Sequence, residues 1–134
     1  MADTEDAGEI FDAAARMRGL AAEQATGLEQ RVRLAEERRD ELLGLREATS
    51  EQQSHLDEML NGLLSTARAQ LAFSAKQATL AGELLAVVNP EEPEHVGIVT
   101  AEADAADTLS RSLRALAAVM RLIDETRRHV KGRE

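Results

Sequence analysis

Residues 59–88, MLNGLLSTARAQLAFSAKQATLAGELLAVV, decide the predicted fold. Only three of these thirty residues are charged (Arg68, Lys76 and Glu83), whereas 31% of the whole chain is charged. A helix whose surface is apolar or small and polar on most sides needs neighbours on several sides. We therefore predict that this helix is the centre of the fold, and that the more charged segments before and after it supply those neighbours.

The composition is typical of an all-α protein. Ala, Glu, Leu, Arg and Lys make up more than half of the 134 residues, and this bias together with helical periodicity indicates long helices or coiled coil. The length is that of one domain, so we expect a single helical unit over residues 1–134. With two Phe and no Tyr or Trp, the packing must rely on Leu and Ala, which allow helices to approach closely.

Charge and cysteine content exclude several classes of function. A net charge of −9 argues against general nucleic-acid binding, which depends on clustered Lys and Arg. The absence of cysteine excludes disulfides and thiolate chemistry and fits a reducing compartment, so we expect a cytoplasmic protein. The acidic residues 1–17 do not resemble a signal or transit peptide. Asn61, Arg68 and Lys76 interrupt the central apolar stretch and make a membrane span unfavourable.

The first predicted helix has a heptad pattern with polar interruptions. Arg31 and Arg38 occupy positions in this pattern that would weaken a tight two-stranded coiled coil. The charged run RLAEERRDE at residues 33–41 is interpreted as a solvated helix face. The pattern itself consists of Ile10, Ala14, Met17, Ala21, Gln24, Leu28, Arg31, Ala35, Arg38, Leu42 and Leu45.

Two alternatives remain open around residues 48–51. Thr49 with Gln52, and Ser50 with Gln53, each match a capping box, which would start a second helix here. However, the heptad pattern continues through this region without Gly or Pro. A break gives an elongated antiparallel three-helix bundle with helices of similar length. Continuity gives a long helical hairpin that dimerises as a coiled coil or four-helix bundle. We expect the bundle, with helices over about residues 6–48, 51–88 and 100–131.

Local signals predict the loop before the third helix. Asn89 and Pro90 end the second helix, because proline disfavours helical geometry in the residue before it. The acidic loop at residues 89–98 contains two prolines, and Thr100 is the predicted cap of the third helix. Gly82, like Gly62, lies inside the second helix, which indicates either close approach by a neighbouring helix or a glycine without a structural role.

Twelve apolar residues are predicted to form a seam that is either part of the core or a surface for a partner. They follow the three-four spacing of amphipathic helices. In the second helix they are Leu56, Met59, Leu63, Leu71, Phe73, Leu80 and Leu84, and in the third they are Leu109, Leu113, Leu116, Met120 and Ile123.

Catalytic and metal-binding patterns are weak. His55 could accept a phosphate on a helix, but no acidic residue follows it directly and no Lys lies three positions later, so we expect a surface histidine. Only Glu92 and His95 have the Glu-x-x-His spacing of helical di-metal sites, and Pro93 interrupts that segment. There is no glycine-rich phosphate loop. We therefore expect no catalytic, cofactor-binding or metal-binding residues.

The sequence favours a non-enzymatic helical scaffold or adaptor. Three long amphipathic helices would leave apolar strips exposed unless another copy or a protein partner covers them, so a homo-oligomer is expected. The alternative is a small acidic assembly or export chaperone that holds a partner's amphipathic segment. In that case the third helix would be the exchangeable element. A third hypothesis, from a different class, is a phosphotransfer protein that uses His55.

Overall fold

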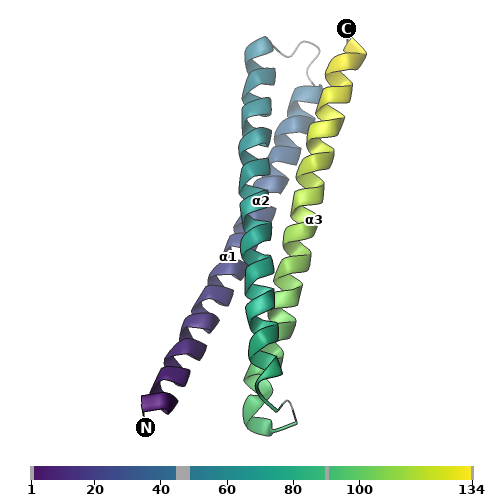
Figure 1. The fold of residues 1–134 in the computed structure, drawn as a ribbon. Coiled ribbons are helices and arrows are strands. Elements are labelled where there is room, and N and C mark those ends of the chain that lie inside the picture. The colour runs from purple at the N-terminus through teal and green to yellow at the C-terminus, as the bar shows by residue number, and fades with distance from the viewer. Residues whose placement is uncertain (1, 45–48, 90, 134) are drawn as a thin grey trace.

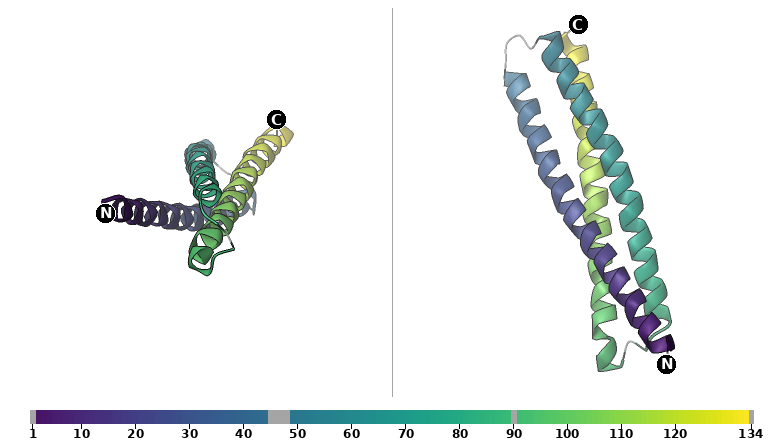
Figure 2. Two further views of the ribbon diagram at one scale, coloured as in Figure 1. Left: turned by 60° about the horizontal axis from the view of Figure 1, so that its bottom comes forward. Right: turned by 90° about the vertical axis from the view of Figure 1, so that its left-hand side faces the viewer.

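Three long helices form an elongated antiparallel bundle (Figures 1 and 2). The computed structural model describes residues 2–44, 49–89 and 91–133. Helix α1 spans Ala2–Gly44, α2 spans Ser50–Ala86, the short 3₁₀ helix η1 spans Pro93–His95, and α3 spans Val96–Arg133. Each of the three long helices contacts the other two, and the described residues contain no strand. The predicted all-α three-helix bundle is confirmed.

The chain reverses between α1 and α2, as Figure 1 shows. Thr49 caps α2: its side chain accepts a hydrogen bond from the Gln52 amide at 3.1 Å, and its own amide donates to Gln52 Oε1 at 2.9 Å. This capping box satisfies two amides that have no partner within the helix. Of the two predicted boxes this one forms, and the single long helix is wrong. Residue 48, the predicted end of the first helix, lies outside the described residues.

The connection from α2 to α3 differs from the prediction. Helix α2 ends at Ala86, and the Asn89 carbonyl accepts a hydrogen bond from His95 Nδ1 at 2.7 Å. Pro93 begins η1, where a fixed φ and a missing amide hydrogen are favourable. Because η1 leads directly into α3 at Val96, the predicted cap at Thr100 is wrong and that residue lies within the helix.

The interior has two parts of different chemistry. Near the α1–α2 connection it is an apolar cluster of Leu28, Val32, Ala35, Leu42, Leu56, Leu60, Leu63, Ala67, Ala115, Val119 and Leu122. Toward the α2–α3 connection the buried residues are small or polar: Ala21, Ala25, Gln70, Ser74, Gln77, Ala81, Ala105, Thr108 and Ser112. In this second part α1 diverges from α2 and α3 toward its N-terminus (Figures 1 and 2), and none of residues 12–20 is buried.

The predicted seam is only partly inside the bundle. Leu56 and Leu63 are buried, and Leu71, Phe73, Leu84, Leu109, Leu116 and Ile123 are partly exposed. Four residues are exposed: Met59, Leu80, Leu113 and Met120. Helices α1 and α3 both pack on α2, as predicted, but the coverage of α2 is less extensive than expected, because each helix of a three-helix bundle has only two neighbours. Those neighbours cover one face of α2 and leave the rest of its apolar surface accessible.

The face that α3 turns to the core lies one residue away from the predicted one. The buried residues are Ala105, Thr108, Ser112, Ala115, Val119, Leu122 and Thr126. One residue corresponds to a rotation of about 100° around a helix with 3.6 residues per turn. The inner residues are mostly small, which lets the helices approach closely, while Leu116 and Ile123 pack at the edge of the cluster.

The two glycines of α2 do not mark close helix contacts. A Cβ built on Gly62 would meet no atom within 4 Å, and one built on Gly82 would meet only Glu102 Oε1, at 3.9 Å. That distance is an ordinary van der Waals contact with a flexible side chain. The predicted close backbone approach is therefore wrong at both positions.

Candidate interaction surface

A line of apolar side chains runs along α3 outside the core. Leu113 is 50% exposed and Met120 is 54% exposed, and Leu109, Leu116 and Ile123 are partly exposed. We call these five residues the α3 stripe. Their spacing alternates between four and three residues, which places them on one side of the helix. The seam residues predicted for the third helix thus lie together, but on the flank of the bundle rather than at its centre.

Helix α2 covers one edge of the α3 stripe. Leu116 and Ile123 pack against the apolar cluster together with Leu64 of α2, whereas Leu113 and Met120 project beyond it. The stripe is therefore held in a fixed orientation by side chains that are anchored in the bundle. Its outer edge remains available to another apolar surface.

Two side chains of opposite charge extend the α3 stripe at its ends. Glu102 lies seven residues before Leu109, and Arg127 lies seven residues after Met120, so both are on the same side of α3. Neither side chain forms an ion pair with another residue in the described ranges. Neither residue belongs to the seam predicted from the sequence, although their seven-residue spacing from Leu109 and Met120 could have identified them.

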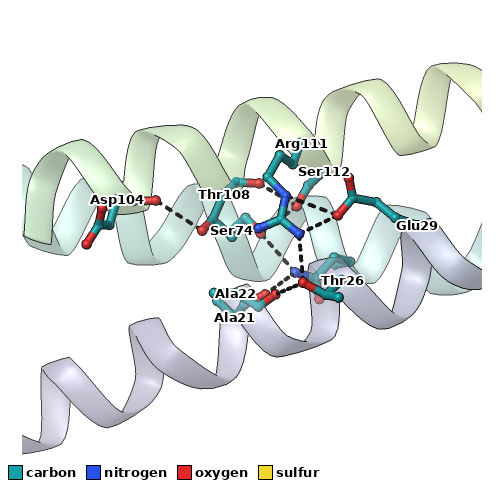
Figure 3. Close-up of polar contacts among 10 residues, drawn as sticks. Ala21, Ala22, Thr26, Glu29, Ser74, Asp104, Thr108, Arg111 and Ser112 are labelled. Atoms are coloured by element: carbon teal, nitrogen blue, oxygen red, sulfur yellow. Dashed lines mark hydrogen bonds and ion pairs between the residues drawn. The ribbon is translucent and has the colours of Figure 1, made fainter.

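The opposite side of α3 is closed by polar contacts with α1 (Figure 3). Arg111 Nε donates to Glu29 Oε1 at 3.0 Å, and Arg111 Nη2 donates to Thr26 Oγ1 at 2.7 Å. The hydrogen bond to Glu29 raises the pKa of Arg111 above its usual value, because it favours the charged guanidinium. A second ion pair links Arg39 with Glu125. These contacts keep α1 away from the α3 stripe.

A chain of buried hydrogen bonds joins the three helices. Gln70 Nε2 donates to the Ala21 carbonyl at 2.9 Å and to Ser74 Oγ at 3.1 Å. Ser74 and Ser112 are joined at 2.8 Å, and the Ser112 hydroxyl donates to the Thr108 carbonyl, also at 2.8 Å. Since the hydrogen of Ser112 is used in that bond, Ser74 is the donor to Ser112. The polar part of the interior is thus organised and fixes the register of α1 and α3 against α2.

A cavity of about 440 Å³ lies beside this polar chain, where α1 diverges. Small residues such as Ala15, Gly19 and Ala105 line it, together with Arg18 and Gln77. Gln77 is 4% exposed, and its side-chain amide has no hydrogen-bond partner among the residues that the structure describes. The cavity results from small side chains on the three helices and has room for water molecules beside this amide.

Other exposed apolar residues form less regular patterns. On α2, Met59 and Phe73 share a line with Leu80, but Thr66 interrupts it between the first two. On α1, Leu34 is exposed next to Arg33. Single exposed apolar side chains are normal on protein surfaces. The α3 stripe is distinguished by five apolar residues in unbroken heptad spacing.

The residues weighed for catalysis and metal binding lie apart from the α3 stripe. His55 is exposed, and its Nε2 lies 4.0 Å from Glu51, a carboxylate rather than a cation. His95 Nδ1 lies 3.6 Å from Glu92 but donates to the Asn89 carbonyl. Within the described ranges, no three His, Asp or Glu side chains gather as metal ligands would. None of the described helices has the length and hydropathy needed to cross a membrane.

Comparisons with models of protein families, with curated proteins and with solved structures find no match to this chain.

Proposed function

We propose that this protein is a non-enzymatic helical scaffold or adaptor that binds another helix through the α3 stripe. The observation that carries the proposal is the exposure of Leu113 and Met120 in a bundle whose apolar cluster is complete without them. Apolar side chains in heptad spacing on a rigid helix are the surface to which an amphipathic helix docks. The absence of cysteine supports a cytoplasmic setting for this interaction.

The chaperone alternative, in which α3 is exchanged between partners, receives less support from the contacts of α3. This helix contributes Ala115, Val119 and Leu122 to the apolar cluster, and Arg111 ties it to α1. Releasing α3 would expose the apolar surface of the other two helices. Binding at the α3 stripe requires no such opening.

Site-specific photo-crosslinking in cells tests the proposal. A photoreactive phenylalanine derivative is placed at Leu113 or at Met120. The matched controls carry it at Leu34 or Met59, which are 62% and 43% exposed on other helices. We expect discrete crosslinked products, identified by mass spectrometry, from the two stripe positions and not from the controls.

Competition with an unlabelled chain gives a second readout. An excess of the unlabelled wild-type chain should suppress the crosslinked products, whereas an excess of the variant with Leu113→Ser and Met120→Ser should not. The absence of any product specific to the stripe would refute the proposed function. Mass spectrometry of the crosslinked products identifies the partner, either as a second copy of this chain or as a different protein.

A further inference from the structure

We infer that the helix bound by the α3 stripe is α3 of a second copy of this chain, packed antiparallel. This inference rests on the proposed function and names its partner. It follows from the symmetry of the stripe, from the charges at its ends and from the open side of α3.

The spacing of the stripe is unchanged when the direction of the helix is reversed. From Glu102 to Arg127 the positions on this side of α3 alternate by four and three residues, and reversal about the centre between Arg114 and Ala115 maps the set onto itself. Two copies can therefore pack along a two-fold axis with apolar residues opposite each other. The layers are Leu113 with the partner's Leu116, Leu109 with the partner's Met120, Ala106 with the partner's Ile123, and Glu102 with the partner's Arg127.

The charges at the ends of the stripe select the antiparallel orientation. In this register Glu102 faces the partner's Arg127 at both ends of the interface, because the two-fold axis repeats the pair. A parallel arrangement would place Glu102 near the partner's Glu102 and Arg127 near the partner's Arg127. Like charges facing each other oppose such an arrangement. Electrostatic complementarity thus favours one orientation.

The geometry of the bundle leaves this side of α3 accessible. Ala106, Leu113 and Met120 are exposed, and the contacts of Arg111 with Glu29 hold α1 on the opposite side of the helix. The dimer interface would then consist of α2 and α3 of both copies, with the two α3 helices in contact at its centre. Neither copy has to rearrange its core to form it.

Charge reversal combined with sedimentation equilibrium tests the pairing. We expect Glu102→Arg or Arg127→Glu alone to raise the dissociation constant by on the order of tenfold, because each change creates two repulsive pairs per dimer. The double variant restores attraction and should return to within about threefold of the wild type. Asp104→Arg with Arg121→Glu changes the same number of charges away from the stripe and should leave the dissociation constant unchanged.

Cysteine crosslinking tests the orientation, because the chain has no cysteine of its own. In the antiparallel register, position 109 of one copy lies about 16 Å along the axis from position 109 of the other, given a rise of 1.5 Å per residue. That separation exceeds the reach of a disulfide. A Leu109→Cys chain should therefore not crosslink to itself, but should crosslink to a Met120→Cys chain on oxidation.

Two results would overturn the inference. A parallel dimer would crosslink Leu109→Cys chains to each other, and a wild-type chain that stays monomeric at several hundred micromolar would exclude self-pairing. If photo-crosslinks at Leu113 then named a different protein, the proposed function would stand and only the identity of its partner would change. If no crosslink specific to the α3 stripe formed, both the proposed function and the inferred self-pairing would be refuted.

Discussion

Replacing Leu63 by Ala tests where the core lies. Leu63 is 2% exposed and belongs to the apolar cluster. The change removes three buried carbon atoms, which corresponds to a loss of about 2.4 kcal/mol at about 0.8 kcal/mol each. The cavity that remains raises the expected loss of unfolding free energy to about 3 to 4 kcal/mol, as for other buried leucines.

Met59 and Leu71 provide matched comparisons on the same helix. Met59 is 43% exposed, so Met59→Ala should cost less than about 1 kcal/mol. Leu71 occupies the middle of the central apolar stretch but is partly exposed, so Leu71→Ala should cost about 1 to 2 kcal/mol, not the 2 to 5 kcal/mol of a core leucine. Urea denaturation followed by circular dichroism measures all three. Equal losses at Leu63 and Met59 would refute the assignment of the core.

Three further predictions follow from the helix ends and contacts. Ser50→Pro should change the melting temperature little, because this first residue of α2 follows an extended residue, whereas Asn61→Pro inside the helix should cost about 3 kcal/mol. Equal effects of the two prolines would contradict the helix boundary. Glu29→Gln should cost less than about 1 kcal/mol in a low-salt melt, with the loss shrinking as salt is added, because the ion pair with Arg111 is partly exposed. Deleting residues 99–134 removes one side of the apolar cluster and should abolish cooperative melting; a cooperative transition near the full-length midpoint would show that α1 and α2 fold without α3.

The features that the sequence predicted correctly depend on local chemistry. The capping box of Thr49 and Gln52 is contained in four consecutive residues, and it outweighed the continuous heptad pattern. The proline at residue 90 predicted that α2 ends before it, but the helix ends at Ala86, two residues earlier than expected. By contrast, Thr100 was predicted as a helix start because a threonine precedes acidic residues. The helix instead begins at Val96, directly after η1.

The rotation of α3 could not be predicted in the same way. Between residues 105 and 126, the line that contains Thr108 and Ser112 and the adjacent line that contains Leu109 and Leu113 both lack charged residues, so periodicity alone does not show which of them faces the core. In the structure the line of small residues faces the core, where small side chains permit close helix contacts. The line with Leu109 and Leu113 lies on the flank of the bundle. The sequence therefore identified the residues of the α3 stripe but not whether they face the core.

The unequal interior implies that the bundle opens from one end. Amide hydrogens of residues 12–20 in α1 should exchange with solvent far faster than those around Leu63. The free energy of local opening is small for residues 12–20, because opening them breaks no buried apolar contacts. Exchange followed by mass spectrometry would give this gradient directly, and uniform protection would contradict it. The α3 stripe extends from Leu109 in the weaker half to Ile123 in the stronger one. A partner bound along it would therefore contact both parts of the bundle and link the end that opens most readily to the apolar cluster.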